Sequence, residues 1–445
     1  MKKAFLLLKN MIKSILAVAM IGMMTVVGIL IYVARGGSLA DLPVALQFVL
    51  PDRITVGSET EAANGQAIEG RRVCLQEDGT AEEQEQEALG SLPETEAFVE
   101  SQKLLLESAQ ADSYAYNQLA EDEQALYLEI LWAILEFRED MELSSMDSEE
   151  IARIFQCVLN DHPEIFYIDG YTYTQYTLGD ILKKITFSAS YNMDQDEIVR
   201  RQGEIDAYVE KCFAGMPVGA DEYEVVKYIY EYLIDNTEYD AEAEDNQNIC
   251  SVFLDGRSVC QGYAKATQYL LGQAGIRATL VLGKVSAGEG HAWNLVQING
   301  EWYYVDTTWG DASYQAVGGE SSYPENKMPT INYDYLCVTS KQLCKTHVID
   351  NVVEMPECNA VRDNYYVREG LYFIELDEVQ LEHIFQDGYE KGSAYVTFKC
   401  DSEELYRQMQ ERLIDNQEIF RYLDCPDGIV SYTDNEEQYS MSFWL

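Results

Sequence analysis

The chain has 445 residues, which is long enough for two or three domains that each bury a core of their own. It carries 77 acidic against 31 basic residues, for a formal net charge of −46. So acidic a surface repels phosphate backbones, which argues against nucleic acid as a partner and indicates a solubilising surface. The ten cysteines contain no CxxC pair, which argues against a zinc ribbon or a thioredoxin-like motif.

The N-terminus has the pattern of a membrane anchor. A basic segment at residues 1–13 precedes an apolar run at residues 14–34, and about 20 such residues span the hydrocarbon core of a bilayer. Because four lysines precede the run, the positive-inside rule predicts a single-pass plasma-membrane protein with its N-terminus inside and its body outside. The alternative is secretion after cleavage of a signal peptide near Ala40, where small residues occur.

The next two segments differ in composition. Residues 35–110 are expected to form an acidic linker, since acids, Gln, Gly and Ala dominate and bury little apolar surface, with some helix near residues 98–106. Residues 111–220 are predicted to form an α+β extension. Its apolar positions have helical spacing within residues 127–159 and alternate as in strands near residues 171–191.

The predicted catalytic domain, residues 221–350, contains a helix with a cysteine at its start. Apolar patterning from Val259 to Ala274, followed by Gly275, predicts this helix and places Cys260 at its N-terminus. The free N–H groups and the helix dipole at that end favour a thiolate, which is the nucleophilic form of cysteine.

Three strands are predicted after this helix, in IRATLVLG, HAWNLVQI and EWYYVD. Asn299-Gly300 is a strong turn signal between the last two. With that turn, strand parity makes His291 and Asp306 diagonal neighbours on one face of the sheet. Asp306 can then accept a hydrogen bond from one imidazole nitrogen, which leaves the other to take the thiol proton of Cys260.

A thiol, an imidazole and a carboxylate form a nucleophile, a base and an orienting group. The same residues, Cys260, His291 and Asp306, would be the ligands of a zinc site, which is the alternative interpretation. The chain has only four histidines and shows no second close pair of ligands, so neither a metal nor another cofactor is predicted.

Other residues near the motif have weaker signals. Gln261 is a candidate oxyanion donor beside the backbone N–H of the nucleophile; the alternative is a solvated residue of the first helical turn. Trp293 and Trp309 either form the wall of the cleft or pack in the core. His347, in CKTHV, is expected on a helix that opens at Thr339, in a structural role.

The C-terminal segment, residues 360–445, is predicted to be a small α/β accessory domain without a catalytic cluster. NYYV, LYFIEL and AYVTFK have the pattern of strands, residues 405–413 that of a helix, and IVSYT with YSMSFWL that of a closing hairpin.

The motifs VCQGYAKA, HAWNLVQINGEWYYVDTTW and YDYLCVTSKQL resemble the bacterial transglutaminase-like superfamily, over about residues 222–347. The resemblance implies an α+β, papain-like core in which a helix bearing the cysteine packs on an antiparallel sheet bearing histidine and aspartate. By motif, Cys260 corresponds to the nucleophile, His291 to the base and Asp306 to the orienting residue. The upstream unit resembles the extension that often precedes this domain in extracytoplasmic Gram-positive proteins.

The match departs from animal transglutaminases, which carry Gln before and Trp after the cysteine. Here those positions are Val259 and Gln261, so calcium dependence and donor gripping are not implied. The implied function is acyl transfer through a thioester, from a peptide or isopeptide amide to water (protease or amidase) or to an amine (cross-linking). Its substrate would be a peptide or protein, and cell-wall peptide is suggested by location alone. The alternative is a non-catalytic cell-surface protein that binds ligands in the papain-like cleft.

Overall fold

The computed structural model describes residues 67–75, 100–178, 181–311, 329–424 and 428–445. These group into two compact units: a first unit of residues up to 106, 125–152 and 168–192, and a second unit of residues 107–124, 153–167 and 193–445. The expected basic segment and membrane anchor at residues 1–34 lie outside the described residues. Within the described part, no helix is long and apolar enough to cross a bilayer. The domain boundaries near residues 110, 220 and 350 stay predictions.

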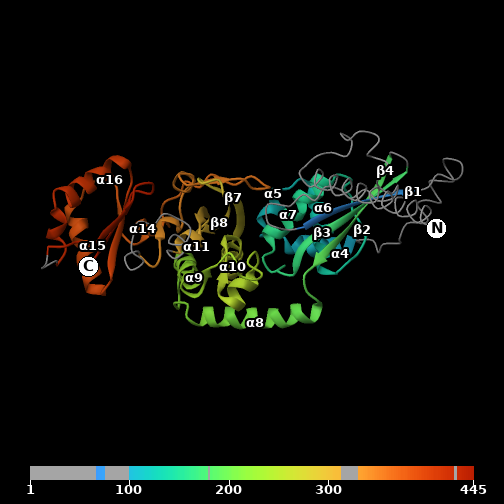
Figure 1. Cartoon of the computed structure of the whole chain (residues 1–445), viewed down its shortest axis with the longest axis horizontal. Coiled ribbons are helices and arrows are strands. Elements are labelled where there is room, and N and C mark those ends of the chain that lie inside the picture. The colour runs from blue at the N-terminus through green and yellow to red at the C-terminus, as the bar shows by residue number, and fades with distance from the viewer. Residues whose placement is uncertain (1–66, 76–99, 179–180, 312–328, 425–427) are drawn as a thin grey trace, which may run out of the picture. The chain divides into compact units, whose positions relative to one another are not determined.

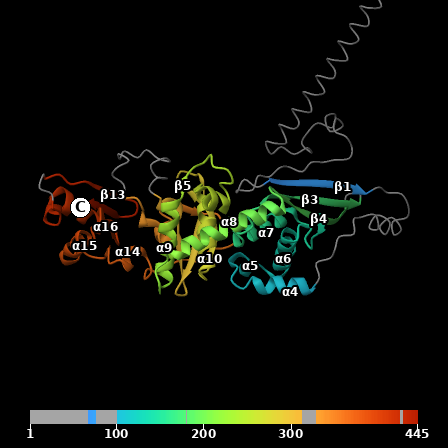
Figure 2. The ribbon, with the colours of Figure 1, turned by 90° about the horizontal axis from the view of Figure 1, so that it is seen from below.

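The first unit is built on a four-stranded sheet in the order β1-β3-β4-β2. Its strands are β1 (Ala67–Leu75), β2 (Met141–Glu142), β3 (Ile168–Leu178) and β4 (Ile181–Tyr191). The antiparallel pair β3 and β4 confirms the strands expected near residues 171–191, and Figure 2 shows β1 running beside β3. Strand β1 was not predicted, because its segment was expected to be part of the acidic linker.

Helices α6 (Glu121–Leu135) and α7 (Ser148–Asp161) occur where helical spacing was expected, and α4 (Glu100–Ala109) overlaps the helix expected near residues 98–106. The short helix α5 (Tyr114–Gln118) was not predicted. The second unit continues with α8 (Gln195–Ala214), α9 (Glu222–Asn236), the short parallel strands β5 (Glu238–Tyr239) and β6 (Arg257–Ser258), and the π-helical turn η2 (Ser251–Asp255).

The central sheet of the second unit is antiparallel throughout, in the order β10-β7-β8-β9. Its strands are β7 (Ala278–Val285), β8 (Gly290–Ile298), β9 (Glu301–Val305) and β10 (His347–Ile349). The three predicted strands are thus confirmed. Ile298 pairs with Glu301 across the predicted turn, and Asn299 and Gly300 have φ of 53° and 84°, both positive as a type I′ hairpin requires.

Helix α10 (Cys260–Gln273) packs against β7 and β8 and also contacts α9, as Figure 1 shows in the middle of the chain. Its predicted start is confirmed, and Gly275 follows its end with φ of 78°, a conformation that favours glycine. Its first turn packs tightly: a Cβ added at Gly262 would clash with Ser258 Oγ and lie 2.9 Å from the carbonyl oxygen of Asn246. Glycine at this position therefore lets the start of α10 approach its neighbours.

Short elements follow the sheet. They are α11 (Thr307–Gly310), the 3₁₀ turn η4 (Tyr333–Tyr335) and α13 (Ser340–Leu343). The C-terminal segment forms a sheet in the order β11-β12-β14-β13, with β11 (Tyr372–Phe373), β12 (Tyr395–Cys400), β13 (Tyr432–Asn435) and β14 (Ser440–Trp444). Its helices are α14 (Tyr365–Arg368), α15 (Glu378–Lys391) and α16 (Glu403–Gln410), with turns η5 (Glu411–Asp415) and η6 (Glu418–Arg421).

The prediction of a strand at NYYV is wrong, because this segment begins helix α14. The side chain of Asn364 accepts a hydrogen bond from the backbone N–H of Tyr366 and so caps the helix. The predicted strand at AYVTFK, the helix near residues 405–413 and the closing hairpin are confirmed.

Candidate active site

Cys260 is the first residue of α10 and is half-buried. No acidic side chain lies in the first turn of the helix, and Val259 before it provides no side-chain cap. The free N–H groups and the positive end of the helix dipole are therefore not neutralised by a carboxylate of the helix itself. The sulfur of Cys260 therefore lies at an uncompensated positive end of a helix dipole.

His291 lies on β8 and Asp306 comes directly after β9 as the N-cap of α11. The imidazole Nε2 of His291 is 2.7 Å from Asp306 Oδ2, and the Oδ1 atom accepts a hydrogen bond from the backbone N–H of Trp309 at 3.0 Å. Both side chains are buried, with 3% and 0% of their surface exposed. Since an ionised carboxylate only accepts, His291 carries its hydrogen on Nε2 when neutral, which leaves Nδ1 for the thiol proton.

The charged forms of His291 and Asp306 stabilise each other. Burial opposes the charged form of His291, but the charge and hydrogen bond of Asp306, together with Cys260, outweigh burial and raise the imidazole pKa to about 10. Burial likewise opposes the charged form of Asp306, yet His291 and His347 hold the pKa of its carboxyl well below its usual range. Each of the two groups therefore favours the charged form of the other.

The contact expected from strand parity is present, although the strand ends earlier than assumed. The ladder between β8 and β9 runs as far as the pair Asn294 and Val305, and the chain then turns into α11. Asp306 still reaches His291, because it is the first residue after the ladder. The catalytic roles of Cys260, His291 and Asp306 stay predictions.

A second imidazole at the carboxylate was missed from the sequence. His347 is not on a helix as expected, because α13 ends at Leu343 and His347 opens strand β10, where it pairs with Val285. Its Nε2 lies 3.0 Å from Asp306 Oδ2, and its side chain is fully buried. A three-residue strand carries too little periodicity to be found from the sequence.

The distances between these groups fit hydrogen bonding rather than metal binding. The ligand atoms of His291, Asp306 and His347 lie within 4.8 Å of one another, a separation that a shared ion would also require. However, the two nitrogen–oxygen distances are 2.7 and 3.0 Å, which are hydrogen-bond lengths. Tetrahedral zinc with bonds of about 2.0–2.1 Å would hold its ligand atoms about 3.3 Å apart.

The two remaining site candidates are both buried. Gln261 is 4% exposed, so the alternative of a solvated first-turn residue is wrong, and its amide nitrogen has no hydrogen-bond partner among the described residues. Trp293 is 0% exposed, and its ring stacks on His291 at 5.8 Å between centroids. The ring centroid of Trp309 lies 6.1 Å from that of His291. Both tryptophans thus lie against the imidazole, while Gln261 remains a predicted donor.

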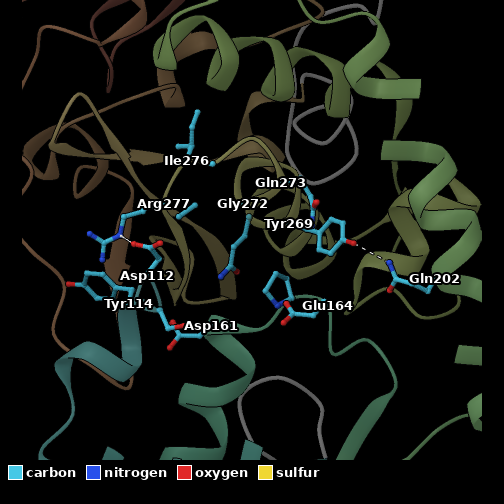
Figure 3. A pocket seen from close by; sticks show the side chains of 15 residues that line it. Asp112, Tyr114, Asp161, Glu164, Gln202, Tyr269, Gly272, Gln273, Ile276 and Arg277 are labelled. Carbon is cyan, nitrogen blue, oxygen red and sulfur yellow. Dashed lines mark hydrogen bonds and ion pairs between the residues drawn. The ribbon is translucent and has the colours of Figure 1, made fainter. Parts of the chain in front are cut away.

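A cavity of about 550 Å³ lies at the opposite end of α10, where its labelled lining includes Asp112, Asp161, Glu164, Gln202, Tyr269 and Arg277 (Figure 3). At about 1.5 Å per residue, this end of the helix is roughly 20 Å from Cys260.

Structural partners occupy the acidic groups of this cavity. Asp161 accepts hydrogen bonds from two backbone N–H groups at the start of α5, both at 2.9 Å. Asp112 lies 3.3 Å from Arg277, and Glu164 lies 2.7 Å from His162. Among the described residues that line this cavity there is therefore no cysteine beside a histidine–carboxylate pair.

Comparison with known proteins gives a consistent result. Residues 215–307 match the transglutaminase-like superfamily. The kyphoscoliosis peptidases of Mus musculus and Homo sapiens are 26% and 25% identical to the chain over 131 residues, a match that covers 26% of this chain and 20% of each relative. The match thus spans about a fifth of the length of these curated relatives.

Similar solved structures include a TGase at 12% identity and a TM-score of 0.24, covering 36% of this chain and 53% of that one. The periplasmic domain of TgpA from Pseudomonas aeruginosa bound to ethylmercury is 17% identical with a TM-score of 0.19, covering 29% and 57%. The family match coincides with the helix and strands that bring Cys260, His291 and Asp306 together. The chain therefore contains a transglutaminase-like domain with an α+β, papain-like core.

Proposed function

We propose that this protein is an extracytoplasmic cysteine enzyme that transfers the acyl group of a peptide or isopeptide amide through a thioester on Cys260. The observation that carries the proposal is the buried pair of His291 and Asp306, 2.7 Å apart, beside a half-buried cysteine at a helix start. Groups with such strongly shifted pKa values are typical of catalytic sites.

The first half of the reaction uses the thiolate and the imidazolium. Sγ of Cys260 attacks the carbonyl carbon of the amide, and the carbon–sulfur bond forms as the carbonyl oxygen becomes an oxyanion. The backbone N–H of Cys260 is a donor for that oxyanion, with the amide of Gln261 as the second candidate. The imidazolium of His291 then gives a proton to the leaving amine, the carbon–nitrogen bond breaks and a thioester remains.

The second half regenerates the enzyme. Water or an amine attacks the thioester carbon and gives a proton to His291, and the carbon–sulfur bond breaks to release the thiolate of Cys260. Asp306 holds the imidazole in place throughout and stabilises its charged form. The relatives named peptidases support water as the acceptor, which makes hydrolysis our first choice over cross-linking.

The N-terminal segment supports the proposed location and substrate class. The apolar run at residues 14–34 supports a membrane anchor, and the body of the protein would then lie outside the cytoplasm. Cell-wall peptides with amide cross-links are the substrates that such a location would offer.

The proposal is tested by trapping the thioester. The full-length protein is mixed with cross-linked cell-wall peptides, and the reaction is quenched in acid after short times. The protein is then digested, and the mass of the peptide containing Cys260 is measured by mass spectrometry. We expect an added acyl mass on that peptide, with released amine, and neither product in Cys260→Ala. Equal cleavage by the wild type and Cys260→Ala would overturn the mechanism.

A further inference from the structure

The carboxylate of Asp306 is held by more donors than a triad requires. Its Oδ1 accepts from the backbone N–H of Trp309 at 3.0 Å, while its Oδ2 faces Nε2 of His291 at 2.7 Å and Nε2 of His347 at 3.0 Å. His347 is 0% exposed at its side chain, so it has no direct path to a substrate in solution. The proposed reaction assigns no role to His347.

The protons at these atoms follow from the acceptor. An ionised carboxylate cannot donate, so His347 must carry a hydrogen on Nε2 to bond to Asp306. When the ring is neutral, its Nδ1 is then an acceptor, and Thr346 Oγ1 lies 2.8 Å from it. The Thr346 hydroxyl also lies 3.3 Å from the carbonyl oxygen of Leu343 and 3.4 Å from the hydroxyl of Tyr335, and both distances are longer than its distance to His347. A buried series of hydrogen bonds thus runs from Thr346 through His347 to Asp306.

The position of His347 is fixed from several sides. Its ring centroid lies 4.8 Å from that of Trp309, 5.0 Å from that of Trp293 and 5.6 Å from that of Tyr335. Gly283 on β7 allows this packing, because a Cβ there would clash with the carbonyl oxygen of Val348 and lie 2.6 Å from the ring of Trp293. The ring therefore has little freedom to turn away from Asp306.

We propose that His347 is a positioning residue of the reaction: it donates Nε2–H to Asp306 and so fixes the carboxylate that orients His291, and Thr346 fixes the tautomer that makes this possible. The inference rests on the proposed function, since it assigns a role within the same site. The sequence alone does not indicate this role, because His291, Asp306 and His347 come from separate elements.

Several titratable groups face this network and enter its pH dependence. Asp306 faces His347 from the start of α11, His291 faces it from β8, and Tyr335 faces it from η4, with Cys260 beyond His291. Tyr230 on α9 also acts on Asp306. Burial raises the pKa of both tyrosines, so they stay neutral in the range tested.

The test compares variants that differ in one donor. The rate at which iodoacetamide alkylates Cys260 is measured from pH 5 to 9 in the full-length protein, by mass spectrometry of the peptide containing Cys260. We expect His347→Leu to lower the rate at pH 6 by about tenfold and to move the profile to higher pH, because a hydrogen bond to a charged group is lost. His347→Gln, whose amide nitrogen reaches about as far as Nε2, should stay within about threefold of the wild type.

A second pair tests the tautomer. Thr346→Val removes the hydroxyl and should lower the rate at pH 6 severalfold, whereas Thr346→Ser keeps it and should stay within about twofold. His383→Gln, at an exposed position on α15, is the control and should match the wild type. Should His347→Leu fail to fold, as judged by circular dichroism, the Gln variant and the Thr346 pair decide the question.

The inference is overturned if folded His347→Leu has the wild-type pH profile. It is also overturned if the alkylation rates of His347→Gln and Thr346→Ser fall as far as those of His347→Leu and Thr346→Val, which lack the donor. An ordinary thiol profile in the wild type itself would contradict the proposed function instead. The two failures are therefore distinguishable in one experiment.

Discussion

The two ends of helix α10 differ in what their polar groups do. At the N-terminal end, Cys260 stands beside a buried imidazole and a buried carboxylate that bond to each other. At the C-terminal end a cavity of about 550 Å³ offers ample room, but its carboxylates bond to helix starts and basic groups of the fold. We infer that a cysteine beside a histidine–carboxylate pair, rather than the available space, marks the proposed reactive end.

The largest effect is expected from removing the nucleophile. Cys260→Ala should lower thioester formation and product release by at least about 10⁴-fold, because no other described group near His291 supplies a thiolate. Gly272→Met at the other end is the matched variant, since Gly272 lines the cavity and a Cβ there meets nothing within 4 Å. The rate of product release by Gly272→Met should stay within about twofold of the wild type. A loss as large as that of Cys260→Ala would contradict the distinction between the two ends of α10.

The next effect concerns the carboxylate. Asp306→Asn removes a charge that two imidazoles require, and the rate of product release should fall by about 10²–10³-fold as His291 loses its charged partner. Glu164→Gln is the same exchange of carboxylate for amide at the cavity, and its rate should change less than twofold. Equal losses in the two variants would contradict the assignment of the reactive end.

The pH dependence of stability gives a third test. The pKa of His291 is raised from 6.5 to about 10, so its contribution to the free energy of unfolding is fully present below pH 6.5 and is lost as the pH rises through 10. The pKa of Asp306 is lowered, so its contribution is present above about pH 4 and is lost only at lower pH.

We therefore expect His291→Gln to be less stable than the wild type by about 2–4 kcal/mol at pH 5–6 and by much less near pH 10. Urea unfolding at several pH values measures this difference. A difference that stays constant across this range would show that the charge of His291 does not stabilise the fold.

The smallest effects come from two glycines on the same helix. Gly262→Ala should destabilise the protein by about 1–3 kcal/mol and slow Cys260 alkylation, because its Cβ would press on Ser258 and Asn246. Gly272→Ala should stabilise it by up to about 1 kcal/mol, since alanine favours a helix and the space is open. Thermal unfolding of both variants checks the opposite signs.

The sequence predicted the parts of the site that depend on local signals. Helix α10 begins and ends where its apolar pattern and Gly275 indicate, and Asn299-Gly300 sets the register that brings His291 towards Asp306. These signals were sufficient to predict the helix and the hairpin, because turn residues and strand parity determine structure over only a few neighbouring residues.

The parts that were missed depend on long-range contacts. His347 reaches the site through a three-residue strand whose partner β7 lies about sixty residues earlier in the chain, and no local pattern reports that pairing. Strand β1 is likewise defined by its parallel pairing with β3. The burial of Gln261 depends on tertiary packing around α10, which the first turn of a helix does not reveal.

The central claim is that His291 holds Cys260 ready as a thiolate, and the rate of Cys260 alkylation by iodoacetamide against pH tests it most directly. We predict that the wild type reacts well below the pKa of a free thiol, about 8.5, and that His291→Ala loses this reactivity at low pH. A wild-type rate that follows an ordinary thiol, unchanged in His291→Ala, would contradict the account and favour a ligand-binding role for the cleft.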